Sequence, residues 1–180
     1  MNFLERLLMK PLALLLGTFL LAGCAVTPQG VTPVADFELD RYLGTWYEIA
    51  RLDHRFERGL SQVSANYSKR PDGGLDVVNR GFNSQTGLWE EAKGRAYFIG
   101  EQDVARLKVT FFWPFYGGYN VIELDQKNYS YALICGPSKK YLWILARDKK
   151  LDAGITKALI NKATELGFNT GELIFVEQQE

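Results

Sequence analysis

Few side chains in this sequence are of a type that could make or break covalent bonds. The chain of 180 residues has one histidine, His54, and two cysteines, Cys24 and Cys135. His54 lies in a long polar segment, which favours a solvent-exposed side chain over a catalytic base or a haem ligand. Cys135 ends an apolar run and is expected to be a small buried hydrophobe rather than a reactive thiol.

The remaining candidates for enzyme chemistry are equally weak. Glu90 and Glu91 are adjacent in a strand-like run, so they point to opposite faces and cannot form a carboxylate pair. The sequence contains no G-x-S-x-G elbow, P-loop, G-x-G-x-x-G or H-E-x-x-H motif. An enzyme would need a serine or cysteine beside His54 and hydrolytic activity above background. We therefore expect a protein that is not an enzyme and that has no cofactor.

Charge and composition exclude further classes of protein. The 21 basic and 21 acidic residues give a formal net charge of zero, so the chain has no field to hold a nucleic acid. One histidine and two cysteines are too few soft ligands for a structural zinc site, and we expect no metal. With 47% apolar and 23% charged residues, the chain can fill the core of one domain.

The N-terminal residues have the pattern of an export signal. Arg6 and Lys10 precede an apolar run over 12–22, which is shorter than the roughly 20 residues that a membrane-spanning helix needs. The run ends in Leu21-Ala22-Gly23-Cys24, which resembles the lipobox of bacterial lipoproteins. An ordinary signal peptide with an incidental cysteine is the alternative.

The lipobox resemblance implies a signal peptide over 1–23 and a lipidated Cys24, whose thiol and new amine both carry acyl groups. Two or more acyl chains hold a protein stably to a bilayer, whereas one holds it only reversibly. Ala25 rather than Asp follows the cysteine, which by the same resemblance favours the outer membrane. Residues 24–35 are predicted to be the lipidated cysteine and an extended linker, and residues 36–180 the folded domain.

The body of the chain reads as a series of short strands, because apolar and polar residues alternate between turn residues. The predicted strands span 44–51, 62–69, 75–82, 91–99, 105–112, 119–125, 129–135 and 141–147, with a turn at Gly117-Gly118 among those between them. Short connections force antiparallel pairing, and closure into a barrel removes the edges.

Helical spacing replaces this alternation over 151–168, where Asp152 is the expected N-cap and Gly167 the C-terminal stop. Residues 173–176 read as a last strand. The sequence thus predicts an all-β fold, an eight-stranded up-and-down antiparallel barrel with a C-terminal α-helix and a short final strand.

Two motifs give this barrel a family resemblance. Gly44-Thr45-Trp46-Tyr47 resembles the G-x-W signature of the lipocalins, and 143–147, ending in Arg147, resembles the closing arginine motif of that family. The middle T-D-Y motif is degenerate in 124–129, so the local loop geometry is expected to differ. Together with the lipobox, the chain resembles the bacterial outer-membrane lipoprotein lipocalins.

Gly44, Trp46 and Arg147 are expected to be structural residues. If Trp46 plugs the closed end of the barrel, Arg147 can stack on its ring and donate to nearby carbonyl groups. A cation–π pair of this kind contributes about 0.5–2 kcal/mol.

Residues in phase with Trp46 are predicted to face a ligand cavity, because side chains alternate along a strand. These are Glu48, Ala50, Ala65, Tyr67, Val77, Asn79, Ala96, Phe98, Leu107, Val109, Phe111 and Trp143. A fully packed core is the alternative to a hollow one. The inward carboxylate of Glu48 needs partners or protonation, which favours a buried hydrogen-bonded group over a ligand contact.

The loops opposite Trp46 are predicted to form the mouth of the barrel. Basic and aromatic residues gather there and fit a phosphate or carboxylate head group at a lipid interface, although a solvated rim is an equal alternative. They are Arg55, Phe56, Arg58, Trp113, Phe115, Tyr116, Lys139 and Lys140.

These features predict a membrane-anchored protein that stores or transports a fatty acid or (lyso)phospholipid in the cell envelope. At ~0.8 kcal/mol per buried methylene, an acyl chain could gain on the order of 10 kcal/mol before ordering costs. The expected partners are this lipid and the membrane, and a homodimer stays open. The alternatives are a structural outer-membrane lipoprotein without a ligand and, less favoured, a lipid-modifying enzyme.

Overall fold

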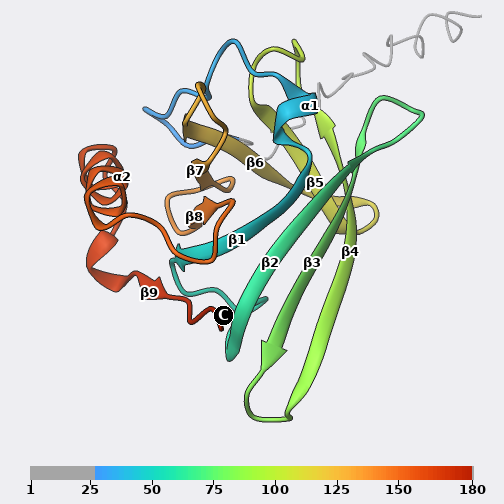
Figure 1. The fold of residues 1–180 in the computed structure, drawn as a ribbon. Helices are drawn as coiled ribbons and strands as arrows, with labels where there is room; N and C mark the ends of the chain where they lie inside the picture. Colours follow the sequence, from blue (N-terminus) through green and yellow to red (C-terminus); the bar gives the residue numbers. More distant parts are fainter. Residues whose placement is uncertain (1–26, 180) are drawn as a thin grey trace, which may run out of the picture.

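The computed structural model describes residues 27–179, which form a closed β-barrel with a helix on its outer wall (Figure 1). The barrel strands are β1 (Gly44–Arg51), β2 (Leu60–Lys69), β3 (Leu75–Asn83), β4 (Leu88–Phe98), β5 (Arg106–Phe112), β6 (Phe115–Leu124), β7 (Tyr131–Cys135) and β8 (Leu142–Ala146). Each strand pairs antiparallel with the next, and β1 pairs with both β8 and β2, which closes the ring. The predicted barrel is confirmed.

The hairpins at one end reach further than the sequence predicts. β4 begins at Leu88, and β6 begins at Phe115, directly after Trp113-Pro114. Gly117 and Gly118 were expected to form a turn, and this is wrong. Both lie within β6, where they pair with Val109 and Lys108. Their backbone is not in the left-handed region, so neither glycine is needed for a turn.

The outer helix α2 (Ala153–Glu165) begins and ends where the sequence predicts. The Asp152 side chain accepts hydrogen bonds from the backbone N–H groups of Gly154 and Ile155, at 2.8 and 3.0 Å. Gly167, with φ +81°, follows the helix and reverses the chain. The 3₁₀ helix η1 (Thr170–Glu172) then leads to β9 (Ile174–Phe175), which pairs with the end of β1.

The packing of α2 creates a second apolar core outside the barrel. Leu159 and Ala163 of the helix are buried against Ala50, Leu133 and Ile144 of the barrel wall. The wall between β7, β8 and β1 is therefore apolar on both faces, whereas β4 is mostly exposed on its outer face. None of the helices within 27–179 has both the length and the apolar character needed to span a bilayer.

The two ends of the barrel are covered differently. The up-and-down topology gathers the β1–β2, β3–β4, β5–β6 and β7–β8 connections at one end, here called the open end. The other connections and the short helix α1 (Leu39–Tyr42) lie at the opposite, closed end, with α1 at the top of Figure 1.

The segment before the barrel packs against its wall rather than forming a free linker. Thr27 Oγ1 donates to Asn120 Oδ1 at 2.8 Å, Val31 is 8% exposed, and Val34 N donates to Val121 O at 2.9 Å. Over 27–35 the chain is therefore not the extended linker that the sequence predicts, because apolar side chains in this segment pack against the barrel wall. The predicted signal peptide and Cys24 lie outside the described residues.

Candidate ligand cavity

The closed end is a floor built around Trp46. Its side chain is fully buried, and its Nε1 donates to the carbonyl oxygen of Tyr42 at 2.8 Å. The Arg147 guanidinium lies 4.0 Å from the centre of the Trp46 ring. It also donates to the carbonyl oxygens of Thr45 and Arg41, both at 2.8 Å. Trp46 of the G-x-W motif and Arg147 of the arginine motif therefore stack and bond as the sequence predicts for a structural pair.

A cavity of about 110 Å³ lies above this floor, between it and the open end. All eight barrel strands contribute to its wall, as do the segment before β1 and the β1–β2 loop. The lining is Phe37, Leu39, Tyr42, Glu48, Glu57, Val63, Ser64, Ala65, Tyr67, Leu75, Val77, Asn79, Ala96, Leu107, Val109, Phe111, Gly118, Tyr119, Ile134, Trp143 and Leu145. Most of these side chains are apolar, so the barrel is hollow and its hollow is hydrophobic.

Three tyrosine hydroxyl groups form a hydrogen-bonded chain at the bottom of this cavity. Tyr119 lies between Tyr42 and Tyr67, with oxygen–oxygen distances of 2.7 and 2.9 Å. Burial is the main cause that raises the pKa of all three phenols above the ordinary value. The three hydroxyl groups stay neutral at physiological pH and satisfy one another, so they add no charge to the floor.

Four ionisable side chains meet at the other side of the cavity, under the β1–β2 loop. Arg51 donates from Nη1 to Glu48 Oε1 at 2.7 Å and from Nη2 to the carbonyl oxygen of Glu57 at 2.7 Å. His54 Nε2 lies 3.1 Å from Glu57 Oε2, which also accepts from Trp143 Nε1 at 3.1 Å. We call Glu48, Arg51, His54 and Glu57 the loop cluster.

The pKa values of the two carboxyl groups of the loop cluster shift in opposite directions. Burial and the nearby Glu57 charge raise the pKa of Glu48, against the effect of Arg51. Burial also acts to raise the pKa of Glu57, but the contacts with His54 and Trp143 outweigh it, and the net pKa is lowered. The cluster thus divides into a carboxyl group that holds a proton readily and one that resists protonation.

Comparison with known proteins decides the family. The model of the lipocalin-like domain matches residues 37–178. The chain belongs to the lipocalin family. The outer membrane lipoprotein Blc of Vibrio cholerae serotype O1 is 53% identical over 95% of this chain and 100% of its own length. Blc of Escherichia coli K12 is 52% identical, over 89% of this chain and 91% of its own.

The wider family shares the fold at lower identity. Insecticyanin from the tobacco hornworm Manduca sexta matches with a TM-score of 0.69 and 22% identity, over 86% of this chain and 87% of its own. The Blc relatives place this lipocalin in the outer membrane, held by a lipid anchor. Neither the family model nor these names describe an enzyme.

Most side chains that the sequence places toward the cavity of this lipocalin do line it. They are Glu48, Ala65, Tyr67, Val77, Asn79, Ala96, Leu107, Val109, Phe111 and Trp143. Ala50 was predicted to face inward, and this is wrong. The pairing of β1 with β8 shifts register between Glu48 and Ala50, and the alternation breaks there. Ala50 therefore faces α2, and Arg51 turns to Glu48.

Phe98 is also absent from the cavity wall. Its ring centroid lies 6.1 Å from that of Phe37, a residue of the segment before β1 that enters the closed end. Phe37 takes the space next to Phe98, which alternation along β4 alone could not reveal.

Sequence reasoning missed several lining residues. Leu75 and Leu145 are in phase with Val77 and Trp143, so extending the alternation by one step would have found them. Glu57 lies in a loop, where no periodicity applies. Val63 and Ser64 line the cavity together with Ala65 because the β2–β3 pairing is irregular between Ser61 and Ser64.

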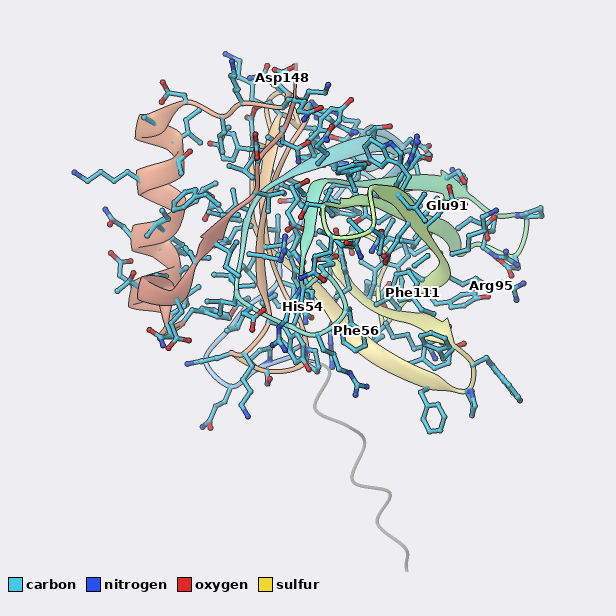
Figure 2. All side chains as sticks on the ribbon, turned by 90° about the horizontal axis from the view of Figure 1, so that it is seen from below. His54, Phe56, Glu91, Arg95, Phe111 and Asp148 are labelled. Carbon is cyan, nitrogen blue, oxygen red and sulfur yellow. The ribbon has the colours of Figure 1, made fainter. Side chains whose placement is uncertain are left out.

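The predicted mouth residues lie at or beyond the rim and none of them lines the cavity. Phe56, Trp113 and Phe115 are 61%, 81% and 78% exposed. In Figure 2, His54 and Phe56 lie together on the β1–β2 loop, and Asp148, just past β8, lies at the other end of the view.

The basic residues of the rim do not form one cationic patch. Arg55 lies over the Phe56 ring, Arg58 pairs with Asp53, and the Lys139 ammonium lies against Gly167, just past α2. The Tyr116 ring contacts Lys108, and Lys140 is exposed. The charged residues that line the cavity itself are the carboxylates Glu48 and Glu57, and a basic head-group site at the rim stays a prediction.

Proposed function

We propose that this lipocalin binds one hydrocarbon chain in its barrel and stores or transports a fatty acid or (lyso)phospholipid at the outer membrane. The observation that carries the proposal is the apolar cavity of about 110 Å³ above a closed floor. A packed barrel interior would leave no such space. Membrane attachment through Cys24, which the lipobox indicates, would keep the carrier next to the lipids that it handles.

The size of the cavity sets the energy that is available for binding. A dry protein cavity of about 150 Å³ holds one benzene molecule, so the cavity of about 110 Å³ has room for about four methylenes. At ~0.8 kcal/mol for each, burial contributes about 3 kcal/mol before ordering costs. Longer chains would extend toward the open end.

A cavity-filling substitution tests the proposal. Ala65→Leu adds three carbon atoms to the wall, and we expect the affinity for decanol to fall at least tenfold while the fold is kept. Ala158→Leu is the matched control, because Ala158 is exposed on α2 and the same carbon atoms then point to solvent. Calorimetry on a soluble, signal-free Cys24→Ser form measures both. Equal affinities for the two variants would contradict a chain in the barrel.

The alternative is a structural lipoprotein without a ligand. It predicts that the unmodified soluble form binds neither decanol nor longer lipids. The aromatic side chains exposed at the open end are compatible with the possible homodimer, because a second copy would remove them from water. Sedimentation equilibrium of the soluble form tests the dimer separately from lipid binding.

A further inference from the structure

β1 and β2 pair with each other along only part of their shared length. The ladder between them ends at the pair Tyr47–Ser64. In the part of the chain that the structure describes, no further pair joins the two strands, although β1 continues to Arg51 and β2 begins at Leu60. Gln62 of β2 has a φ of +51°, in the left-handed region, and the register between β2 and β3 is irregular around it. The barrel wall therefore parts between the open-end halves of β1 and β2.

The C-terminal segment fills this gap. β9 pairs with the open-end half of β1, and Val176 N donates to Ile49 O at 3.0 Å. On the other side of the gap, Gln62 N donates to Glu177 O at 2.8 Å. In Figure 1 the segment, in dark red, passes the end of β1 toward the lower end of β2. We call residues 174–178 the strap, because they join the separated halves of the two strands.

One side chain of the strap spans the whole gap. The Gln178 amide donates from Nε2 to Glu48 O of β1 at 2.9 Å and to Val63 O of β2 at 2.8 Å. Both carbonyl groups belong to residues that line the cavity. From the inner side, Arg51 Nη2 also reaches across the gap, to Leu60 O at 3.3 Å. The closure of the wall therefore depends here on two side chains and a chain end, and not on a continuous ladder.

The strap has little apolar packing to hold it in place. Ile174 and Phe175 are 39% and 61% exposed, and no residue of 174–178 is buried. A segment with exposed backbone hydrogen bonds and little buried apolar surface opens locally at a lower free energy than the core of its domain. The strap bonds to β2 through Glu177 O and Gln178 Nε2, whereas β9 keeps a ladder with β1. We therefore expect the opening to occur between the strap and β2.

We propose that the strap is a side gate of the barrel: it parts from β2, and a hydrocarbon chain enters the cavity between the two strands. The inference rests on the proposed function, because the gate serves the chain that the barrel binds. A slot in the wall suits a single-chain amphiphile, since the chain can move in sideways while its polar head group stays solvated outside. Entry over the rim of the open end is the competing route, and it does not require the strap to move.

A reversible lock tests the gate. Gln62→Cys with Glu177→Cys, in the soluble Cys24→Ser form, joins β2 to the strap, because the 2.8 Å backbone hydrogen bond between these residues brings their Cα atoms within disulfide range. Stopped-flow fluorescence of Trp143, which lines the cavity, follows decanol binding. We expect the oxidised form to bind and release decanol at least tenfold more slowly than the same protein after reduction, with an affinity within threefold. Cys135 is buried, which keeps it out of the new disulfide.

Loosening the strap should have the opposite effect. Gln178→Ala removes the bonds to both carbonyl groups, and we expect the association and dissociation rates of decanol to rise together, about three- to tenfold. Gln179→Ala is the matched control, because this residue is exposed and contacts Lys149 through its backbone oxygen, which the substitution keeps. We expect its rates to equal those of the unmodified protein. A strap with only a structural role would lower the urea midpoint of Gln178→Ala and leave both rates unchanged.

The outcomes separate this inference from the proposed function. If the unmodified protein does not bind decanol, the chain-binding function itself is contradicted. Decanol binding with equal rates in the oxidised and reduced forms would overturn only the gate and assign entry to the rim. If the disulfide does not form or the double variant does not fold, the comparison of Gln178→Ala with Gln179→Ala decides. Equal rates in these two variants contradict the gate, and faster exchange in Gln178→Ala alone supports it.

Discussion

The closed and open ends of this barrel are built on opposite principles. At the closed end, Trp46 is fully buried, and the Arg147 guanidinium makes hydrogen bonds to three backbone carbonyls. At the open end, Arg51 Nε and His54 Nδ1 are buried without hydrogen-bond partners. The donors of Trp46 and Arg147 at the first end find acceptors within the protein, whereas these nitrogens of Arg51 and His54 at the second end do not.

Apolar exposure follows the same division. Among the described residues, the large apolar side chains that are exposed are Phe56, Leu88, Trp89, Phe112, Trp113, Phe115, Ile174 and Phe175. The first six lie on open-end hairpins, the last two on β9, and none at the closed end. We therefore expect the closed end to contribute most to the unfolding free energy of the barrel, and the open end to contribute the surface for binding.

The largest expected effect is the loss of the buried tryptophan. Trp46→Ala removes a fully buried ring and the partner of Arg147, and we expect it to cost about 3–5 kcal/mol of unfolding free energy. Urea denaturation followed by circular dichroism measures the loss. A cost below 1 kcal/mol would show that the closed end does not hold the barrel together.

Arg147→Ala should come next, at about 2–3 kcal/mol, because a stacked cation and its carbonyl hydrogen bonds are lost together. The affinity for decanol should stay within a few-fold, since the guanidinium lies outside the cavity lining. Arg147→Lys keeps the charge without the planar fork and should recover only part of the stability. If Arg147→Ala lost decanol binding while its unfolding free energy stayed unchanged, the closed end would serve binding rather than stability.

Glu48→Gln should change the unfolding free energy by less than Arg147→Ala does, and the size of its effect should depend on pH. The folded pKa of Glu48 is raised above its ordinary 4.5, so its stabilising contribution is present at low pH and is lost as pH rises through the folded value. The glutamine variant lacks this loss. Relative to the unmodified protein, it should gain stability as pH rises above the ordinary glutamate pKa, measured by urea midpoints over a series of pH values. A constant difference across that series would count against a proton held at this site.

The smallest effect is expected at the exposed aromatic residues. Trp113→Ala and Phe115→Ala should each change the unfolding free energy by less than about 0.5 kcal/mol, because these rings are 81% and 78% exposed. The contrast with Trp46→Ala compares the same type of substitution at the two ends. A cost above 1 kcal/mol at either position would mean that the rim is packed rather than available.

The sequence predicts the barrel well because strand alternation and turn residues are local signals. It also places Trp46, Tyr67 and Val77 on the inner face, since each lies in an unbroken stretch of alternation. It fails at Ala50, where a shift of register interrupts the pattern.

Long-range packing explains the remaining differences. Phe37 enters the closed end from a segment that reads as polar, and Glu57 reaches the cavity from a loop. The chemistry of the loop cluster is equally hidden. Arg51 and Glu48 are three residues apart in a strand, and only the broken alternation of β1 brings them together.

Native mass spectrometry of the soluble Cys24→Ser form, purified from cells, tests the central claim most directly. If the barrel holds a hydrocarbon chain, part of the protein should carry one lipid of defined mass, and Ala65→Leu should carry less. Protein that emerges with an empty barrel, and that takes up neither decanol nor lysophospholipid afterwards, would contradict the account.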